Sequence, residues 1–310
     1  MAQVTFCKNA AAGLEAFYEA VKNAMVQNYL TIDVEDYFQV AAFSDIVSRR
    51  DWDTLDQRVG ANIAPILQIL KNHGVRATFF VVGWIAEKHP AVVEAIMAGG
   101  HEIGCHSYWH RNIYDLSPEE FREDTLRAKA VLEKLTNKKI LSYRAPSYSI
   151  TKKTVWALDI LWEIGFTTDS SIFPIKHDIY GMPDSPRFHY RWDPPGIEEY
   201  PISTVIFCGR AVPVSGGGYF RLFPYWFTRF ALKRINNNEK QPFVFYLHPW
   251  EIDCEQPRFE KARLLSKFRH YNNLSKTMDR FERLLTDFDF IPLPVHGAAD
   301  DNGTGVPKTA

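Results

Sequence analysis

His101-Glu102-Ile103-Gly104-Cys105-His106-Ser107-Tyr108-Trp109-His110 is the stretch around which this 310-residue chain is organised. Within it, His106 and His110 are four residues apart, a spacing that would bring both imidazoles to one side of a helical turn. Imidazole nitrogens are common ligands of zinc and of neighbouring divalent metals. The pair alone is equally consistent with two surface histidines on a loop, so its meaning depends on the residues that surround it.

Composition argues against several classes of protein. Hydrophobic residues make up 46% of the chain and the formal net charge is −1, as expected for one large or two small globular domains and not for a dedicated nucleic-acid binder. No run approaches the roughly 18 apolar residues of a membrane span, and the N-terminus lacks the pattern of a secretory signal. We expect a cytoplasmic protein of undetermined oligomeric state, with reduced, buried thiols at Cys7, Cys105, Cys208 and Cys254.

Short apolar runs alternate with amphipathic segments along the chain. The runs predict strands at 28–32, 77–82, the residues before His106, 139–143 and 242–247. The amphipathic segments predict helices at 61–73, 90–98, 118–135, 151–164 and 224–235. This alternation predicts a parallel α/β domain over 29–296, broken by an irregular insertion at about 172–222. A helical extension over 1–28 and a disordered tail over 297–310 would flank it.

Polar clusters follow these apolar runs. They are Asp33-x-Glu35-Asp36, His106-x-x-x-His110, Arg144-x-Pro146, Asp169-Ser170-Ser171 and Leu247-His248-Pro249. Three carboxylates within four residues at a strand end would repel one another, and a nearby cation would remove that cost. A solvated acidic loop is the alternative for the first cluster taken by itself. Together the clusters supply the carboxylate and imidazole ligands of a zinc-type site.

Two further segments carry weaker signals. Ser215-Gly216-Gly217-Gly218 lacks the Lys-Ser/Thr of a phosphate-binding loop, so a flexible or tightly turned loop beside the site is expected instead. The region 258–285 is rich in Lys and Arg at helical spacing. A solvated helix face is the expected interpretation of this region, with an anionic partner as the alternative.

In this order, the five clusters resemble those of the polysaccharide deacetylases that share the NodB homology domain. The nearest resemblance is to the branch encoded with bacterial exopolysaccharide and exosortase loci, and it runs from about Tyr29 to Pro294. It implies a distorted (β/α) barrel with fewer than eight strands. It also implies a carbohydrate substrate and a divalent metal, typically Zn²⁺, held by an aspartate and two histidines.

The resemblance assigns roles to individual residues. His106 and His110 match the metal-binding histidines, and Asp33 matches the catalytic base. The usual motif has two adjacent carboxylates, whereas this chain has Asp33-Val34-Glu35-Asp36, so either Glu35 or Asp36 could be the metal ligand.

The remaining motifs complete a catalytic set. Arg144 matches the arginine that orients the base, and His248 matches the general acid. Asp169 falls near the aspartate that tunes this acid, although the usual tryptophan after it is missing. A backbone amide near Ser147 or Tyr148 would stabilise the oxyanion. Candidates for substrate contact, with core packing as the alternative for each aromatic ring, are Tyr37, Ser147, Tyr148, Tyr219 and Trp250.

The function implied is a metal-dependent hydrolase that removes N-acetyl groups from amino sugars of a bacterial polysaccharide or its precursor. An allantoinase-like amide hydrolase on the same fold is one alternative, against which the retained histidine pair argues. A non-catalytic glycan-binding relative is the other, and such a protein would be expected to have lost Asp33, His248 or a metal ligand.

Overall fold

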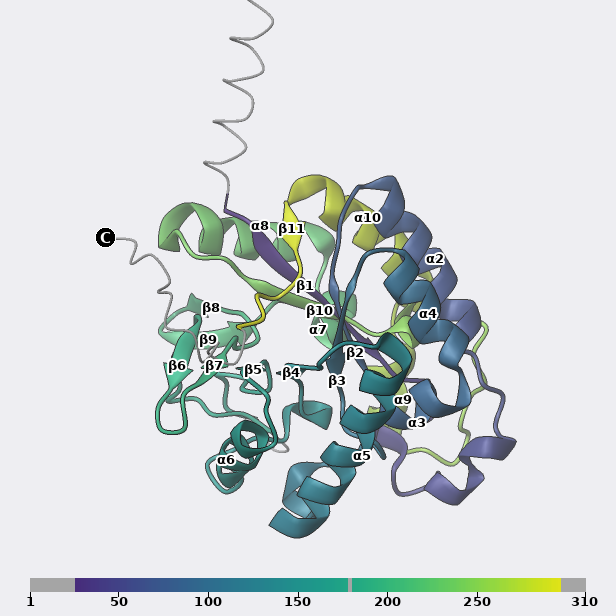
Figure 1. Cartoon of the computed structure of the whole chain (residues 1–310). Helices are drawn as coiled ribbons and strands as arrows, with labels where there is room; N and C mark the ends of the chain where they lie inside the picture. Colours follow the sequence, from purple (N-terminus) through teal and green to yellow (C-terminus); the bar gives the residue numbers. More distant parts are fainter. Residues whose placement is uncertain (1–25, 178–179, 297–310) are drawn as a thin grey trace, which may run out of the picture.

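The computed structural model describes residues 26–177 and 180–296, so the expected helix within 1–28 falls almost wholly outside the described residues, as does the expected tail at 297–310. The main sheet is curled and open, with the strand order β10-β1-β2-β3-β4-β5-β7-β6 (Figure 1). The strands of this sheet are β1 (Asn28–Val34), β2 (Thr78–Val81), β3 (Glu102–Cys105), β4 (Ser142–Tyr143), β5 (Thr168–Asp169), β6 (Tyr190–Trp192), β7 (Ile197–Glu199), β10 (Val244–Leu247) and β11 (Phe290–Ile291). The path from β10 to β7 is parallel throughout and has seven strands, which confirms the expected incomplete barrel, while β6 and β11 bring the whole sheet to nine strands.

Helices cover the outside of the sheet (Figure 1). Their bounds are α2 (Val59–Asn72), α3 (Gly83–Lys88), α4 (Pro90–Ala98), α5 (Pro118–Thr136), α6 (Trp156–Glu163), α7 (Gly217–Leu222), α8 (Tyr225–Arg234), α9 (Leu264–Tyr271) and α10 (Thr277–Asp287). Local sequence signals set several of these bounds. In α5, Ser117 and Glu120 form a reciprocal capping box and Pro118 occupies the first turn. None of the described helices is long and apolar enough to cross a membrane.

The register of the strands places the polar clusters at one edge of the sheet. Ile32 of β1 pairs with Leu247 of β10, and Val34 of β1 pairs with Val81 of β2. The residues that follow these strands therefore emerge side by side, at the carboxyl ends of parallel strands where ligands bind in open α/β sheets. The core beneath this edge is apolar and closely packed, because β1 and β2 are buried along almost their whole length.

The region 172–222 is not the irregular insertion that its prolines and glycines suggested. It contains β6, β7 and a separate two-stranded sheet of β8 (Thr204–Phe207) and β9 (Arg210–Pro213). β7 pairs in parallel with β5 and so extends the main sheet. These strands have only three or four residues each, too few to show a periodic pattern.

The cysteines were also predicted incorrectly in part. Cys105 is buried at the end of β3, but Cys208 and Cys254 are exposed, and all three are free thiols. Cys7 lies outside the described residues.

Candidate metal centre and catalytic site

The two histidines of the opening stretch approach one another through a loop and not through a helical turn. Residues 106–110 follow β3 in irregular conformation, with φ of 58° at Ser107 and 49° at His110. The Ser107 hydroxyl accepts a hydrogen bond from the backbone amide of His110 at 3.0 Å and closes the loop. Left-handed conformations at non-glycine residues cost ~1–3 kcal/mol each and tend to occur at functional sites. The loop conformation, and not helical periodicity, therefore brings the imidazoles together.

Three buried side chains converge at this point. Nε2 of His110 lies 3.3 Å from Nε2 of His106 and 2.6 Å from Oε2 of Glu35. The three ligand atoms all lie within 4.8 Å of one another. Glu35 follows β1 and His106 follows β3, so the sheet itself positions two of the three groups.

The protonation states of these side chains suit a metal ion. Nδ1 of His106 contacts the carbonyl of Arg144 at 2.7 Å, and Nδ1 of His110 contacts the carbonyl of Gln39 at 2.8 Å. Each Nδ1 must carry a proton to make these bonds, so Nε2 is the ring nitrogen that each histidine turns toward the shared point. Burial lowers the pKa of His106 to about 4, which keeps its imidazole neutral.

The carboxylate completes the set. Burial alone would raise the pKa of Glu35, but His110 and His248 hold it below its usual range, so Glu35 is ionised. An ionic hydrogen bond joins Nε2 of His110 to Glu35, and a divalent cation held by all three groups would take the place of its proton. The residues present therefore fit a divalent metal with two imidazole ligands and one carboxylate ligand.

The carboxylate of Asp36, the alternative ligand, is hydrogen-bonded to backbone amides and does not contact the two histidines. Its carboxylate accepts backbone hydrogen bonds from Arg58 at 2.7 Å, from Val59 at 3.0 Å and from Tyr37 at 2.9 Å. The bonds from Arg58 and Val59 satisfy amides at the start of α2, where a helix has unpaired donors. Burial raises the pKa of Asp36 to about 6. Of the two carboxylates left open by the sequence, Glu35 is thus the one that faces the histidines.

This difference gives a paired prediction. We expect Glu35→Gln to weaken metal binding by at least roughly 10-fold, because it removes a charged ligand. We expect Asp36→Asn to retain the metal but to lower the free energy of unfolding by about 1 kcal/mol or more, because an amide group would face backbone donors. Metal titration and thermal denaturation of both variants test this, and loss of metal from Asp36→Asn as severe as from Glu35→Gln would contradict it.

Asp33 lies beside the metal-binding group and is held by a buried arginine. Nη1 of Arg144 donates to Oδ1 of Asp33 at 2.7 Å and to the hydroxyl of Thr31 at 2.6 Å. The same guanidinium donates to the carbonyl and hydroxyl of Ser170. Arg144 has no exposed surface, so these bonds fix its position. The structure thus brings Asp33 and Arg144 into direct contact, while their roles as base and positioning arginine stay predictions of the resemblance.

His248 follows β10, and its side chain approaches Glu35 and Asp33. Its Nε2 lies 3.5 Å from Oε1 of Glu35 and 3.8 Å from Oδ2 of Asp33, while its Nδ1 lies 3.1 Å from Oε2 of Glu251. Burial would lower the pKa of His248, but Glu35, Glu251 and Asp33 together raise it to about 9. A proton donor is therefore present beside the proposed base.

The sequence interpretation missed the two residues that hold His248. Glu251 is fully buried and accepts a hydrogen bond from Nε of Arg221 at 2.8 Å. Arg221 is buried too, and its other nitrogens donate to the carbonyls of residues 269, 270 and 272. A signal for Glu251 existed, since a glutamate three residues after His248 can close a capping box at a helix start. Arg221 is far away in sequence and gave no such signal.

Asp169 does not tune His248, contrary to the prediction. The groups that act on His248 are Glu35, Glu251 and Asp33. Asp169 is buried at the end of β5, where it accepts a hydrogen bond from the Ser171 hydroxyl at 2.6 Å and lies against Glu199. Burial raises the pKa of both carboxyls. Asp169 supports the segment that holds Arg144. The contact with His248 that was predicted for Asp169 is made by Glu251 instead.

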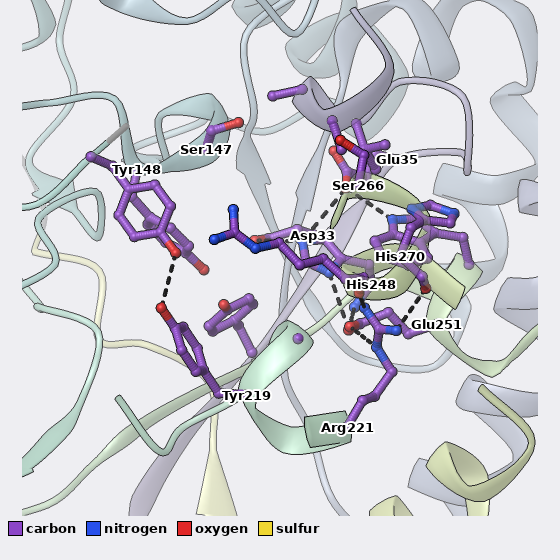
Figure 2. A pocket seen from close by; sticks show the side chains of 18 of the residues that line it. Asp33, Glu35, Ser147, Tyr148, Tyr219, Arg221, His248, Glu251, Ser266 and His270 are labelled. Carbon is purple, nitrogen blue, oxygen red and sulfur yellow. Dashed lines mark hydrogen bonds and ion pairs between the residues drawn. The ribbon is translucent and has the colours of Figure 1, made fainter. Parts of the chain in front are cut away.

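A cavity of about 430 Å³ opens over these groups. Four of the five predicted substrate-contact residues line it, namely Ser147, Tyr148, Tyr219 and Trp250. Figure 2 shows Tyr148 and Tyr219 on one side of the cavity, with Asp33 and His248 on the other. Nε1 of Trp250 also donates to Oε1 of Glu35 at 2.9 Å. The cavity therefore combines an aromatic wall with a polar floor that contains the candidate metal ligands.

Tyr37, the fifth candidate, packs in the core instead. Its side chain is 1% exposed and stacks on Phe259 at a centroid distance of 5.7 Å. The glycine-rich segment starts α7 and does not form an open loop. A Cβ at Gly216 would collide with the carbonyl of Tyr246, so the glycine permits a close backbone approach that sets Tyr219 in the cavity wall.

Comparison with known proteins agrees with this arrangement. Residues 52–167 match the family model described as polysaccharide deacetylase, and residues 170–295 match a domain of unknown function, DUF3473. Two successive segments of the chain thus match family models, the first that of polysaccharide deacetylases and the second DUF3473. The resemblance drawn from the sequence motifs is confirmed at this level.

Individual relatives are similar over part of their length. The peptidoglycan-N-acetylglucosamine deacetylase of Bacillus cereus is 36% identical over 95 residues, which is 30% of this chain and 34% of that protein. The peptidoglycan deacetylase-like protein FGM2 of Gibberella zeae is 32% identical over 117 residues, 37% of this chain and 33% of that protein. The matched stretch thus spans about a third of each of these relatives.

A solved structure shows the shared fold. A polysaccharide deacetylase homologue from Mycobacterium smegmatis superposes with a TM-score of 0.53 at 22% identity, over 88% of this chain and 87% of that chain. The site draws on both matched segments, because His106, His110 and Arg144 lie in the first while His248 and Glu251 lie in the second. The DUF3473 segment therefore contributes side chains to the candidate site.

Proposed function

We propose that this protein is a metal-dependent hydrolase that removes N-acetyl groups from amino sugars of a bacterial polysaccharide or its precursor. The observation that carries the proposal is the convergence of Glu35, His106 and His110 on one cavity with Asp33, which Arg144 holds from below the cavity surface. The names of the relatives support the same chemistry. The motifs shared with the exopolysaccharide and exosortase branch support an exopolysaccharide as the polymer.

Asp33 would accept a proton from the attacking water. It is 2% exposed and reaches the cavity, and Arg144 keeps one of its oxygens fixed at 2.7 Å. The other oxygen remains directed to the side where His248 lies. A carboxylate held in this way can act as a general base without rotating away from the reacting group.

Glu35, His106 and His110 would hold the divalent ion. When bound, the ion would supply a Lewis acid to the acetyl carbonyl and lower the pKa of the attacking water. The backbone at Ser147 and Tyr148 would share the oxyanion charge, and both residues have positive φ, of 51° and 53°. Because the amide of Tyr148 already donates to the carbonyl of Ala145 at 3.1 Å, the amide of Ser147 is the better placed donor.

His248 would protonate the departing amine. Glu251 fixes its Nδ1, and the opposite nitrogen faces the cavity near Asp33. Replacement of His248 with alanine is therefore expected to reduce kcat by roughly 10²–10⁴-fold. Metal content should stay at the wild-type level, because His248 is outside the ligand set.

Acetate release and metal content of His248→Ala, measured together, test this role. His73→Ala is the matched control, since His73 lies at the end of α2 away from the cavity. A wild-type kcat in His248→Ala would show that this histidine only packs against Trp250, on which it stacks at 5.2 Å.

The activity itself is tested with N-acetylglucosamine oligomers of increasing length. The proposal expects stoichiometric release of acetate and of one free amine per reaction. Hydrolysis of a cyclic amide such as allantoin, without acetate release from any glycan, would favour the allantoinase-like alternative. Glycan binding with no turnover in the metal-loaded protein would favour a non-catalytic binding protein.

A further inference from the structure

A cluster of apolar side chains on α9 is exposed next to the cavity. Leu264 is 84% exposed, Leu265 is 59% exposed and Phe268 is 55% exposed. These three residues lie within little more than one turn of the helix, and we call them the α9 apolar surface. Large apolar side chains grouped in this way usually mark a binding surface, whereas single exposed ones are normal.

This surface borders the cavity entrance. Ser266, Phe268 and Arg269 of the same helix line the cavity, and so do Ala41 and Ala42 of the short helical turn η1 (Ala41–Phe43). α9 packs against η1, and Arg263 forms an ion pair with Asp45 at 3.0 Å just beyond it. A partner bound to the α9 apolar surface would therefore lie close to the entrance of the cavity.

The charge around the surface is strongly positive. Residues 258–271 contain five Lys or Arg residues and a single acidic one, Glu260, in a chain whose formal net charge is −1. Lys261, Arg263 and Arg269 are exposed around the apolar side chains. A short amphipathic segment with Leu and Phe on one side and basic residues around them is typical of segments that lie in the headgroup region of an anionic bilayer.

We propose that the α9 apolar surface docks the protein on an anionic membrane surface, with the leucines in the headgroup region and the basic residues on the phosphates. The cavity entrance then faces the bilayer, so the substrate of the proposed deacetylation would be a glycan presented at a membrane. This last point rests on the proposed function, but the docking itself does not. The described helices need not span the membrane for such docking.

The test is binding to vesicles by co-sedimentation. Wild-type protein is expected to bind vesicles of equal parts phosphatidylglycerol and phosphatidylcholine, and to bind pure phosphatidylcholine much more weakly. Leu264→Ser/Leu265→Ser should reduce partitioning to the anionic vesicles by about 10-fold or more, because it removes the inserting side chains. Lys261→Glu/Lys267→Glu should reduce it too, and added salt should weaken the wild-type binding.

The matched control is a second exposed apolar pair. Trp226 and Phe230 of α8 are 69% and 54% exposed, and α8 is well separated from α9 in Figure 1. Trp226→Ser/Phe230→Ser should bind vesicles like the wild type. Leu264→Ser/Leu265→Ser should keep wild-type turnover of a short soluble oligosaccharide, because neither leucine lines the cavity.

Three results would overturn the proposal. The first is no preference of the wild type for anionic vesicles, and the second is unchanged binding of Leu264→Ser/Leu265→Ser. The third is that the wild type is a dimer, that Leu264→Ser/Leu265→Ser is a monomer, and that neither protein binds vesicles. That result would assign the α9 apolar surface to contact with a second copy of the chain. Each readout is independent of catalysis, so a failure of the deacetylase proposal would be seen separately, in the acetate assay.

Discussion

Replacement of both His106 and His110 with alanine is expected to abolish metal binding and activity together. The two imidazoles supply two of the three ligand atoms that converge at the floor of the cavity, and both are almost completely buried. The remaining carboxylate of Glu35 cannot hold a divalent ion by itself at ordinary affinity. Loss of a Lewis acid worth several kcal/mol should lower kcat by about 10³-fold or more.

Metal analysis of the purified double variant and its rate of acetate release check this expectation. His73→Ala again serves as the control, with full metal and full activity. Full metal occupancy in the double variant would show that the ion binds elsewhere, and the scheme built on Glu35, His106 and His110 would then be wrong.

Asp33→Asn is expected to abolish turnover while the metal stays bound. The substitution keeps the size of the side chain and can keep a hydrogen bond from Arg144, but it removes the capacity to accept a proton. The expected loss in kcat is roughly 10²–10⁴-fold, the usual contribution of a positioned general base. Asp33 lies outside the convergent ligand set, so its role should be separable from metal binding.

Metal content and kcat are measured for Asp33→Asn and compared with the same quantities for Asp53→Asn. Asp53 is an exposed aspartate that pairs with Lys88 at 2.7 Å, far from the cavity. If Asp33→Asn lost its metal as completely as the double histidine variant, Asp33 would be a ligand and another group would have to act as base.

The parts of the fold that the sequence predicted share one physical feature. Strands with a continuous buried apolar run and helices that begin at a proline leave clear local signals, so β1, β2, α4 and α5 lie close to their expected positions. Polar residues directly after those strands were placed correctly for the same reason. Parallel strands that end in register deliver their next residues to a common edge, as the pairing of Ile32 with Leu247 shows.

The errors arose where the backbone or distant packing decides the outcome. The loop from His106 to His110 depends on left-handed conformations that the sequence pattern did not reveal. Tyr37 packs on Phe259, more than two hundred residues later in the chain, and spacing along the chain cannot predict that contact. The choice of Glu35 over Asp36 depended on whether one carboxylate was needed at the start of α2, which only the structure shows.

The correction at His248 has the same origin. Asp169 was assigned to it by resemblance, but β5 places Asp169 beside Glu199, and the turn after β10 places Glu251 beside His248. The hydrogen bond from Arg221 to Glu251 lies within the DUF3473 segment, which in this way holds His248 at the candidate site. This segment also contributes Tyr219 to the aromatic wall of the cavity, whereas Tyr148 belongs to the polysaccharide deacetylase match.

Metal titration of activity tests the central claim most directly. The protein is stripped with a chelator, Zn²⁺ is added back in steps, and acetate release from an N-acetylglucosamine oligomer is measured at each step. The account predicts no acetate release from the stripped protein and a linear recovery that ends at one equivalent of metal per chain. Undiminished acetate release from the fully stripped protein, or none at any metal content with every oligomer, would contradict it.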